Sequence, residues 1–472
     1  MAASLTAFGV IALPLVIGIT LFKQQLLLPA LVIATTLQAP SVLNIDFGHG
    51  GLRYGVTAFS LIAIVIVLSL TRLVRRPYTR RDWLSGSAGL NLKLWLAYAA
   101  IAILGAALLP FVFANTPVYL LVAKDSFESG PAPLRWTLSN LAQTGNLVLL
   151  VGVLVYIRLH REDPQLLKRM LVGLAIALVL SALIGLQQRL GWHQILPMIA
   201  DFWASNPAYA QNFISYAGPV ARVSWPFTEP AYGSAWYAAM FGGCLVVFFA
   251  GRATQLALLG MLIAAFALLN SLGATGIMAI GVFGLIAVPL WLFFFARHPQ
   301  LRWKLGYQLV LAALVLSCFA LAIYIVLRHA GLLPNAQSAI ANLLVGNNPT
   351  FWGDIRPQTN LHAWTVFRDS SGLGVGLGSN RASSYFASLF SNTGVLGGLV
   401  FLAALSHLGF ALATAQTAIK TQDAALFLLG ALCTATIAVT IAIPDQNWPN
   451  YWVFILTGYA CISQNTRHGG PL

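Results

Sequence analysis

The chain has 472 residues, of which 58% are hydrophobic and only 8% are charged. Soluble domains carry roughly 25% charged residues, so this composition excludes an ordinary water-soluble protein. The apolar residues come in runs of about 20, long enough to cross a ~30 Å hydrocarbon core as helices. A transmembrane barrel is excluded as well, because the ~10-residue alternating segments of such barrels are missing.

The net charge is +14, from 26 lysines and arginines against 12 acidic residues. Most of this charge lies in short loops between apolar runs, where basic residues set the orientation of a membrane protein. Nucleic acid is therefore not an expected partner. The four cysteines all fall inside apolar runs without metal-ligand spacing, so we expect small buried side chains there. Neither a metal nor a cofactor is expected.

The apolar runs predict an all-α fold, a polytopic transmembrane bundle of about 12–14 spans with long periplasmic loops. The first run is interpreted as a retained span, because the N-terminus lacks a basic region and a signal-peptide cleavage site. In chain order, the predicted spans cover residues 5–22, 26–43, 54–71, 94–114, 137–157, 170–187, 231–250, 255–272, 276–296, 306–327, 392–415, 424–443 and 451–463.

The basic residues predict the orientation of these spans. The loop after 54–71 carries five arginines, and alternate later loops carry Arg158, Arg252, Arg297 and Lys420. Placing these loops in the cytoplasm is consistent along the whole chain. The N-terminus is then outside and the C-terminus inside.

Five regions follow from this assignment. They are N-terminal transmembrane helices at 1–190, a periplasmic loop at 191–230, central transmembrane helices at 231–327, a large periplasmic loop with a glycine-rich segment at 328–391, and C-terminal transmembrane helices at 392–472. The two loops exceed the ~15 residues of ordinary connections, which is typical of functional or disordered segments. Their many aromatic residues indicate structure at the membrane interface.

The first candidate site ends the loop at 191–230. Arg222 could bind a phosphate through its planar, permanently charged fork. Glu229 stands between Thr228 and Pro230, where partial desolvation could raise its pKa toward that of a general base. Alternatively, Arg222 anchors the chain at the interface and Glu229 caps a helix that begins at Pro230.

A short turn between two predicted spans, residues 270–276, is the second candidate. Its small residues would let another segment or a ligand approach the backbone closely. A simple hairpin turn explains the same residues.

The glycine-rich segment is the third candidate. Alternate glycines Gly374, Gly376 and Gly378, followed by Ser379, could leave backbone N–H groups free to bind an anion, with Arg381 adding charge. The alternative is a re-entrant connector whose arginines reach toward lipid headgroups.

His362 lies in the same loop and titrates near neutral pH, so it could act as a base or a phosphate donor. A structural role beside Trp364 is the competing interpretation. No metal-binding or nucleophile motif accompanies it.

In their order along the chain, these features resemble the O-antigen ligase and polymerase superfamily of bacterial inner-membrane glycosyltransferases. The resemblance covers about residues 215–410. It is carried by Arg222 with Phe227–Pro230, by Ser271 to Gly276, by Gly374–Ser379 and by Asn392–Gly397.

The resemblance implies glycan transfer from an undecaprenyl-diphosphate donor on the periplasmic face, without metal. Arg222, Arg356 and Arg381 are the arginines implied to hold the diphosphate, and the catalytic base stays open between Glu229 and His362. Ligases carry an arginine in the short turn and a histidine after the glycine-rich run. This chain has Gly273–Thr275 and Asn380–Ser384 there instead.

These departures favour an exopolysaccharide-type polymerase that joins lipid-linked repeat units. A ligase onto another acceptor is the alternative enzyme, and a transporter or flippase of lipid-linked glycans is the alternative from another class. The expected location is the bacterial inner membrane. Expected partners are the undecaprenyl-diphosphate-linked glycan, membrane lipids and other polysaccharide-assembly proteins.

Overall fold

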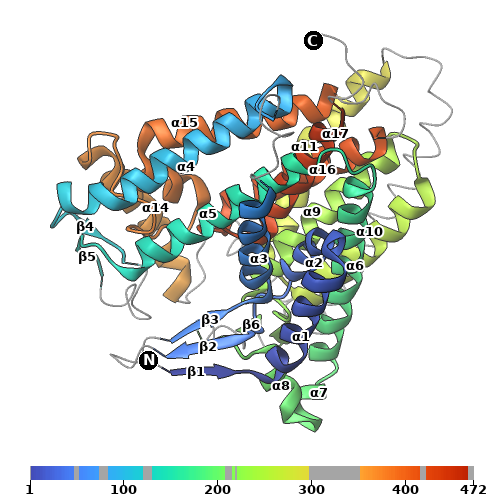
Figure 1. Ribbon diagram of the computed structural model, residues 1–472, viewed down its shortest axis with the longest axis horizontal. Coiled ribbons are helices and arrows are strands. Elements are labelled where there is room, and N and C mark those ends of the chain that lie inside the picture. The colour runs from blue at the N-terminus through green and yellow to red at the C-terminus, as the bar shows by residue number, and fades with distance from the viewer. Residues whose placement is uncertain are drawn as a thin grey trace, which may run out of the picture. The chain divides into compact units, whose positions relative to one another are not determined.

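The computed structural model describes residues 2–46, 53–73, 83–120, 130–207, 215–217, 220–296, 351–414 and 421–465 (Figure 1). Within these residues, seven helices are long and apolar enough to cross a membrane. They are α4 (Gly86–Val112), α5 (Leu138–Leu159), α6 (Leu166–Arg189), α9 (Pro230–Phe249), α10 (Thr254–Ser271), α15 (Tyr385–Thr414) and α16 (Gln422–Ala442). The chain is therefore a multi-pass, helical membrane protein, which confirms the predicted fold class.

Shorter helices and three small sheets complete the described chain. The other helices are α1 (Ala7–Phe22), η1 (Gln24–Leu26), α2 (Leu27–Ala34), α3 (Ala58–Leu73), α7 (Trp192–Ile195), α8 (Pro197–Trp203), α11 (Ala274–Ala296), α14 (Phe351–Asp369) and α17 (Pro449–Asn465). The strands are β1 (Ala2–Leu5), β2 (Leu43–Asp46), β3 (Arg53–Val56), β4 (Pro117–Val118), β5 (Ala132–Pro133), β6 (Ser215–Ala217) and β7 (Val220–Arg222). The predicted span at 306–327 lies outside the described residues.

The predicted span at 26–43 is wrong in its length. Helix α2 ends at Ala34, so its eight residues cover only ~12 Å. The hydroxyls of Thr35 and Thr36 turn back to the carbonyls of Val32 and Ile33, 2.7 and 2.9 Å away. The chain then enters β2, which pairs antiparallel with β1 and β3. Apolar composition alone does not reveal this early helix end.

By its internal contacts, the chain divides into two compact units. Unit 1 contains residues 1–62, 168–344 and 422–438, and unit 2 contains 63–167, 345–421 and 439–472. Each unit thus combines segments that are far apart in the sequence.

Helix α9 is the most buried long helix of unit 1. It packs against α10 and α11, and small residues bring it close to α11 and α16. A Cβ on Gly242 would lie 2.1 Å from the Thr434 hydroxyl, and one on Gly276 would lie 2.2 Å from the Ser234 carbonyl oxygen. These glycines permit the close approach of neighbouring helices, which is how membrane helices pack without a hydrophobic driving force.

In unit 2, α15 packs along α4, and α5 packs against α4 and α17 (Figure 1). Aromatic rings fill the space between these helices. The Trp95 ring lies 5.3 Å from Phe401 and 5.0 Å from Trp452, and Tyr385 lies 5.5 Å from Tyr451. All of these side chains are buried.

Contacts between the ends of helices agree with the prediction that successive loops lie alternately outside and inside the membrane. In unit 1, two loops predicted outside meet where Ser41 N donates to Ser205 Oγ at 3.0 Å. In unit 2, two loops predicted inside meet where Arg158 Nη2 donates to Ser85 O at 2.8 Å. Which end of each unit is cytoplasmic stays a prediction from the basic residues.

Candidate functional site

The glycine-rich segment of unit 2 packs into a break in helix α15. Gly394 has φ 70° and ψ −174°, values outside the helical region, so α15 consists of two helical pieces. Val395 N donates to Gly372 O at 2.8 Å, and a Cβ on Gly394 would lie 2.3 Å from Leu373 O. Only glycine therefore fits at this break.

The three alternating glycines serve close packing. Gly374, Gly376 and Gly378 have φ values of 77°, 98° and 83°, which side-chain-bearing residues rarely adopt. A Cβ on Gly376 would lie 2.8 Å from the Gly105 carbonyl of α4, and one on Gly378 would lie 2.8 Å from the Ser139 carbonyl of α5. The segment thus lies directly against the backbone of both helices.

Backbone amides of this segment, expected to be free for an anion, are bonded within the chain. Asn392 Oδ1 accepts from Ser379 N at 3.0 Å and from Asn380 N at 2.9 Å. Val375 N donates to Ser391 O and Gly376 N to Asn392 O, each at 2.9 Å. This arrangement favours the re-entrant connector over an anion-binding concavity.

Two further asparagines hold the same segment. Asn140 Nδ2 of α5 donates to Leu377 O and to the buried Ser379 Oγ, each at 2.8 Å. Asn360 Oδ1 of α14 accepts from Ser383 N and Ser384 N, each at 2.8 Å. Within a bilayer, irregular backbone must be satisfied by the protein itself, and these amides do so.

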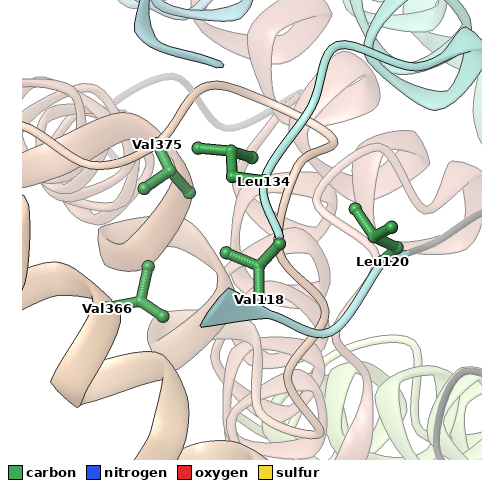
Figure 2. Close-up of a cluster of buried hydrophobic side chains, with 5 residues drawn as sticks. All are labelled: Val118, Leu120, Leu134, Val366 and Val375. Atoms are coloured by element: carbon green, nitrogen blue, oxygen red, sulfur yellow. The ribbon is translucent and has the colours of Figure 1, made fainter. Parts of the chain in front are cut away.

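A small apolar cluster lies beneath the β4–β5 hairpin. Figure 2 shows Val118, Leu120 and Leu134 of the hairpin region facing Val366 of α14 and Val375 of the glycine-rich segment. All five side chains are buried. The cluster fixes the hairpin against the segment that carries Arg381.

His362 and Arg381 flank one residue of this hairpin region. The Tyr119 ring lies 5.1 Å from the His362 ring, edge to face, and Tyr119 O accepts from Arg381 N at 2.8 Å. His362 Nε2 lies 2.9 Å from Pro117 O. Because a carbonyl oxygen only accepts, Nε2 carries a hydrogen, which leaves Nδ1 as the basic nitrogen of a neutral ring.

A carboxylate that the sequence analysis did not single out lies near Arg381. Asp445, in the short connection between α16 and α17, is half-buried, and its Oδ1 accepts from Asn447 N at 3.0 Å. Burial raises the pKa of Asp445, while Asn447, Gln143 and the Arg381 charge lower it; burial prevails. The sequence alone could have pointed to Asp445, because it is the one acidic residue in the loop between the last two predicted spans.

Arg356 and Ser379 are two other predicted residues of unit 2. Arg356 lies in α14, and its side chain is outside the described ones. Ser379 is buried and bonded to Asn140, so it is placed to hold the segment in position. In unit 2, Tyr119 thus links His362 to the backbone of Arg381, and the Arg381 charge acts on Asp445.

In unit 1, Arg222 ends β7 and Glu229 occupies the N-cap position of α9, with Pro230 as the first helical residue. The Glu229 side chain makes no capping hydrogen bond, so the predicted capping role is met by position alone. Gln188 Oε1 accepts from Ser224 N and Trp225 N, each at 2.9 Å. This amide anchors the loop that carries both predicted residues.

The turn at 270–276 is a tight, packed connection. Arg189 donates to Asn270 Oδ1 at 2.8 Å and to Asn270 O at 2.6 Å. Gly276 N donates to Ser234 Oγ at 3.2 Å, and a Cβ on Gly273 would lie 2.3 Å from Ser234 Cβ. Its small residues therefore permit another segment of the chain, α9, to approach. Arg189 was not singled out from the sequence.

Among the described residues, no group of three or more histidine, cysteine, aspartate or glutamate side chains could hold a metal ion. No protein-family model matches the chain, and no curated protein matches it. Function is therefore inferred from the residues and their geometry.

Proposed function

We propose that this chain is a polysaccharide polymerase that joins undecaprenyl-diphosphate-linked repeat units on the periplasmic face of the bacterial inner membrane. The observation that carries the proposal is the convergence of Arg381, His362 and Asp445 at one end of unit 2. These residues belong to two loops that the basic-residue pattern assigns to the outside: His362 and Arg381 lie in the loop at 328–391, and Asp445 lies between the last two predicted spans. The resemblance of the motifs to the O-antigen ligase and polymerase superfamily supports the same reading.

The chemistry of this end suits a lipid diphosphate. A guanidinium binds phosphate oxygens through two parallel hydrogen bonds and keeps its charge at every physiological pH. Arg381 is half-buried, so its field is screened less than that of a fully exposed arginine. Such a charge would stabilise the leaving diphosphate as the glycosidic bond breaks.

Exposed apolar side chains on α14 and the glycine-rich segment, the elements that carry His362 and Arg381, suit the lipid part of the donor. Leu361 and Trp364 of α14 and Leu373 of the glycine-rich segment are exposed, and the Trp364 ring lies 5.8 Å from Phe390. In a bilayer, such side chains contact acyl or polyprenyl chains. A donor could thus keep its polyprenyl tail in the membrane while its diphosphate meets Arg381.

The break in α15 at Gly394 favours the second candidate function, a transporter or flippase. Broken helices line the substrate sites of many transporters. Val395 and Leu396, which directly follow the break at Gly394, are exposed, so the break lies beside lipid-facing surface. A ligase would share the donor site and differ only in its acceptor.

Reconstitution separates these functions. Purified protein in liposomes would be given lipid-linked repeat units extracted from a host strain that lacks the chain. A polymerase releases undecaprenyl diphosphate and lengthens the glycan; a ligase needs an added acceptor; and a flippase moves the intact lipid without breaking a bond. Unchanged lipid-linked units with no released diphosphate would contradict the proposal.

The proposed binding of the diphosphate by Arg381 is tested by exchanging arginine for lysine. We expect Arg381→Lys to lower polymer formation at least about tenfold, because lysine keeps the charge but loses the planar fork. Arg222→Lys tests the equivalent prediction in unit 1, and the exposed Arg135 provides the matched control Arg135→Lys. Normal polymer length and yield in Arg381→Lys and Arg381→Ala would make Arg381 an interfacial anchor.

A further inference from the structure

The connection between α16 and α17 is held in place by α15 and by α17 itself. Gln446 O accepts from Tyr385 Oη of α15 at 3.1 Å and from Trp452 Nε1 of α17 at 2.9 Å. Gln446 Nε2 lies 3.4 Å from Ser388 Oγ of α15. The residue next to Asp445 is therefore fixed, although the connection itself is only a few residues long.

On the other side of Asp445, Asn447 is bound to α5. Its Nδ2 donates to Gln143 O at 2.9 Å and to Gln143 Oε1 at 2.6 Å. Because Gln143 Oε1 accepts this bond, its own NH₂ group is left to donate, and it bonds to the Asp445 carboxylate. Asp445 is thus held by Asn447 N and by Gln143.

Two ionisable groups of the described chain act on the Asp445 carboxylate, from the elements packed around it. Arg381, just before α15, lowers the pKa of Asp445, and Tyr385 at the start of α15 interacts with the same carboxylate. Gln143 of α5 and Asn447 contribute neutral donors. Asp445 is half-buried, so an incoming hydroxyl could reach it.

We propose that Asp445 is the general base of the transfer reaction, taking the proton of the acceptor hydroxyl beside Arg381. This inference rests on the proposed function. The acceptor oxygen forms a bond to the anomeric carbon, and the bond from that carbon to the diphosphate oxygen breaks. The electron pair leaves with the diphosphate, which Arg381 stabilises, and the hydroxyl proton passes to the Asp445 carboxylate.

Geometry distinguishes Asp445 from other groups of unit 2. Asp369, at the end of α14, is exposed, and its Oδ1 lies 3.6 Å from Arg368 Nε, so it lacks the partial burial of Asp445. A carboxylate whose pKa is raised toward the working pH also accepts a proton more readily than an ordinary aspartate.

The test is Asp445→Asn, which removes the charge and keeps an oxygen for Asn447 N. We expect turnover of extracted lipid-linked repeat units to fall about 10²–10⁴-fold, the usual contribution of a general base. Binding of undecaprenyl diphosphate should change less than about threefold, since Arg381 is intact. The matched control is Asp369→Asn, which should retain wild-type turnover. Normal turnover in Asp445→Asn overturns the inference.

The pH profile separates catalysis from a structural role. A base must be ionised, so wild-type turnover should fall as pH falls through the raised pKa of Asp445. The residual activity of Asp445→Asn should lose this acidic limb, and an unchanged limb overturns the inference. If Asp445→Asn fails to accumulate, Asp445→Glu replaces it; its acidic limb should shift with donor binding unchanged, and an unshifted limb again overturns the inference.

Different results would contradict the proposed function and the proposed role of Asp445. A wild-type protein that makes no polymer from lipid-linked units contradicts the proposed function itself. A wild-type polymerase whose Asp445→Asn variant is equally active contradicts only the role of Asp445.

Discussion

The Arg222–Glu229 loop of unit 1 and the glycine-rich segment of unit 2 are anchored by the same device. In each, one amide side chain accepts from two consecutive backbone N–H groups, Gln188 from Ser224 and Trp225, and Asn392 from Ser379 and Asn380. Asn360 repeats the device with Ser383 and Ser384. Irregular backbone next to membrane helices thus receives its hydrogen bonds from side-chain amides.

The two regions differ in how they gather charged groups. The loop of unit 1 carries Arg222 and Glu229 seven residues apart in one stretch. The segment of unit 2 carries Arg381, and separate elements bring His362 and Asp445 to it. A site of the first kind is visible in the sequence, whereas a site of the second kind depends on the fold. The following changes test this contrast, in order of expected effect.

The largest effect is expected at the helix break. Gly394→Ala places a Cβ 2.3 Å from Leu373 O at a residue with φ 70°, so we expect a loss of about 3 kcal/mol or more in stability. Gly409→Ala, on the same helix with nothing within 4 Å of the new Cβ, is the matched control. The control should be neutral or slightly stabilising. Thermal unfolding in detergent measures both, and equal melting temperatures would refute the packing argument.

The second-largest effect is expected at the side-chain amides that hold the two loops, Asn392 and Gln188. Asn392→Leu leaves two buried backbone N–H groups without their acceptor, at a cost of about 1–3 kcal/mol each. We expect polymer formation to fall strongly, because Arg381 follows directly after the released Asn380. Gln188→Leu makes the equivalent change in unit 1. Comparable stability losses with a larger activity loss in Asn392→Leu would place the chemistry in unit 2, and the reverse would place it in unit 1.

The smallest effects are expected from the two bases proposed from the sequence. His362→Gln keeps a donor for Pro117 O, so turnover should fall less than about tenfold, and His362→Phe should cost more. Glu229→Gln keeps the N-cap position and should likewise cost about tenfold or less. Each is measured as polymerisation beside Asp445→Asn. A loss of 10²-fold or more in Glu229→Gln would return the base to unit 1.

Much of the fold was readable from the sequence because hydrocarbon imposes one simple rule. A run of about 20 apolar residues must be a helix there, since no other single segment satisfies its own backbone. The long apolar helices and the alternation of loops follow from this rule and from the basic residues. The early end of α2 at Ala34 did not follow, because it falls within an apolar stretch.

The candidate site was readable only in part. Sequence pattern singled out Arg222, Glu229, Arg381 and the glycine-rich run as candidates, and their role in a site stays a prediction. It suggested that the glycine-run amides were open to an anion, whereas Asn392, 12 and 13 residues further along the chain, accepts from two of them. Tertiary structure alone decided which loops meet. Asp445 is an unremarked acid in a short connection until Gln143, Asn447 and Arg381 surround it, because a side chain's environment is set by contacts between segments and not by its neighbours in the chain.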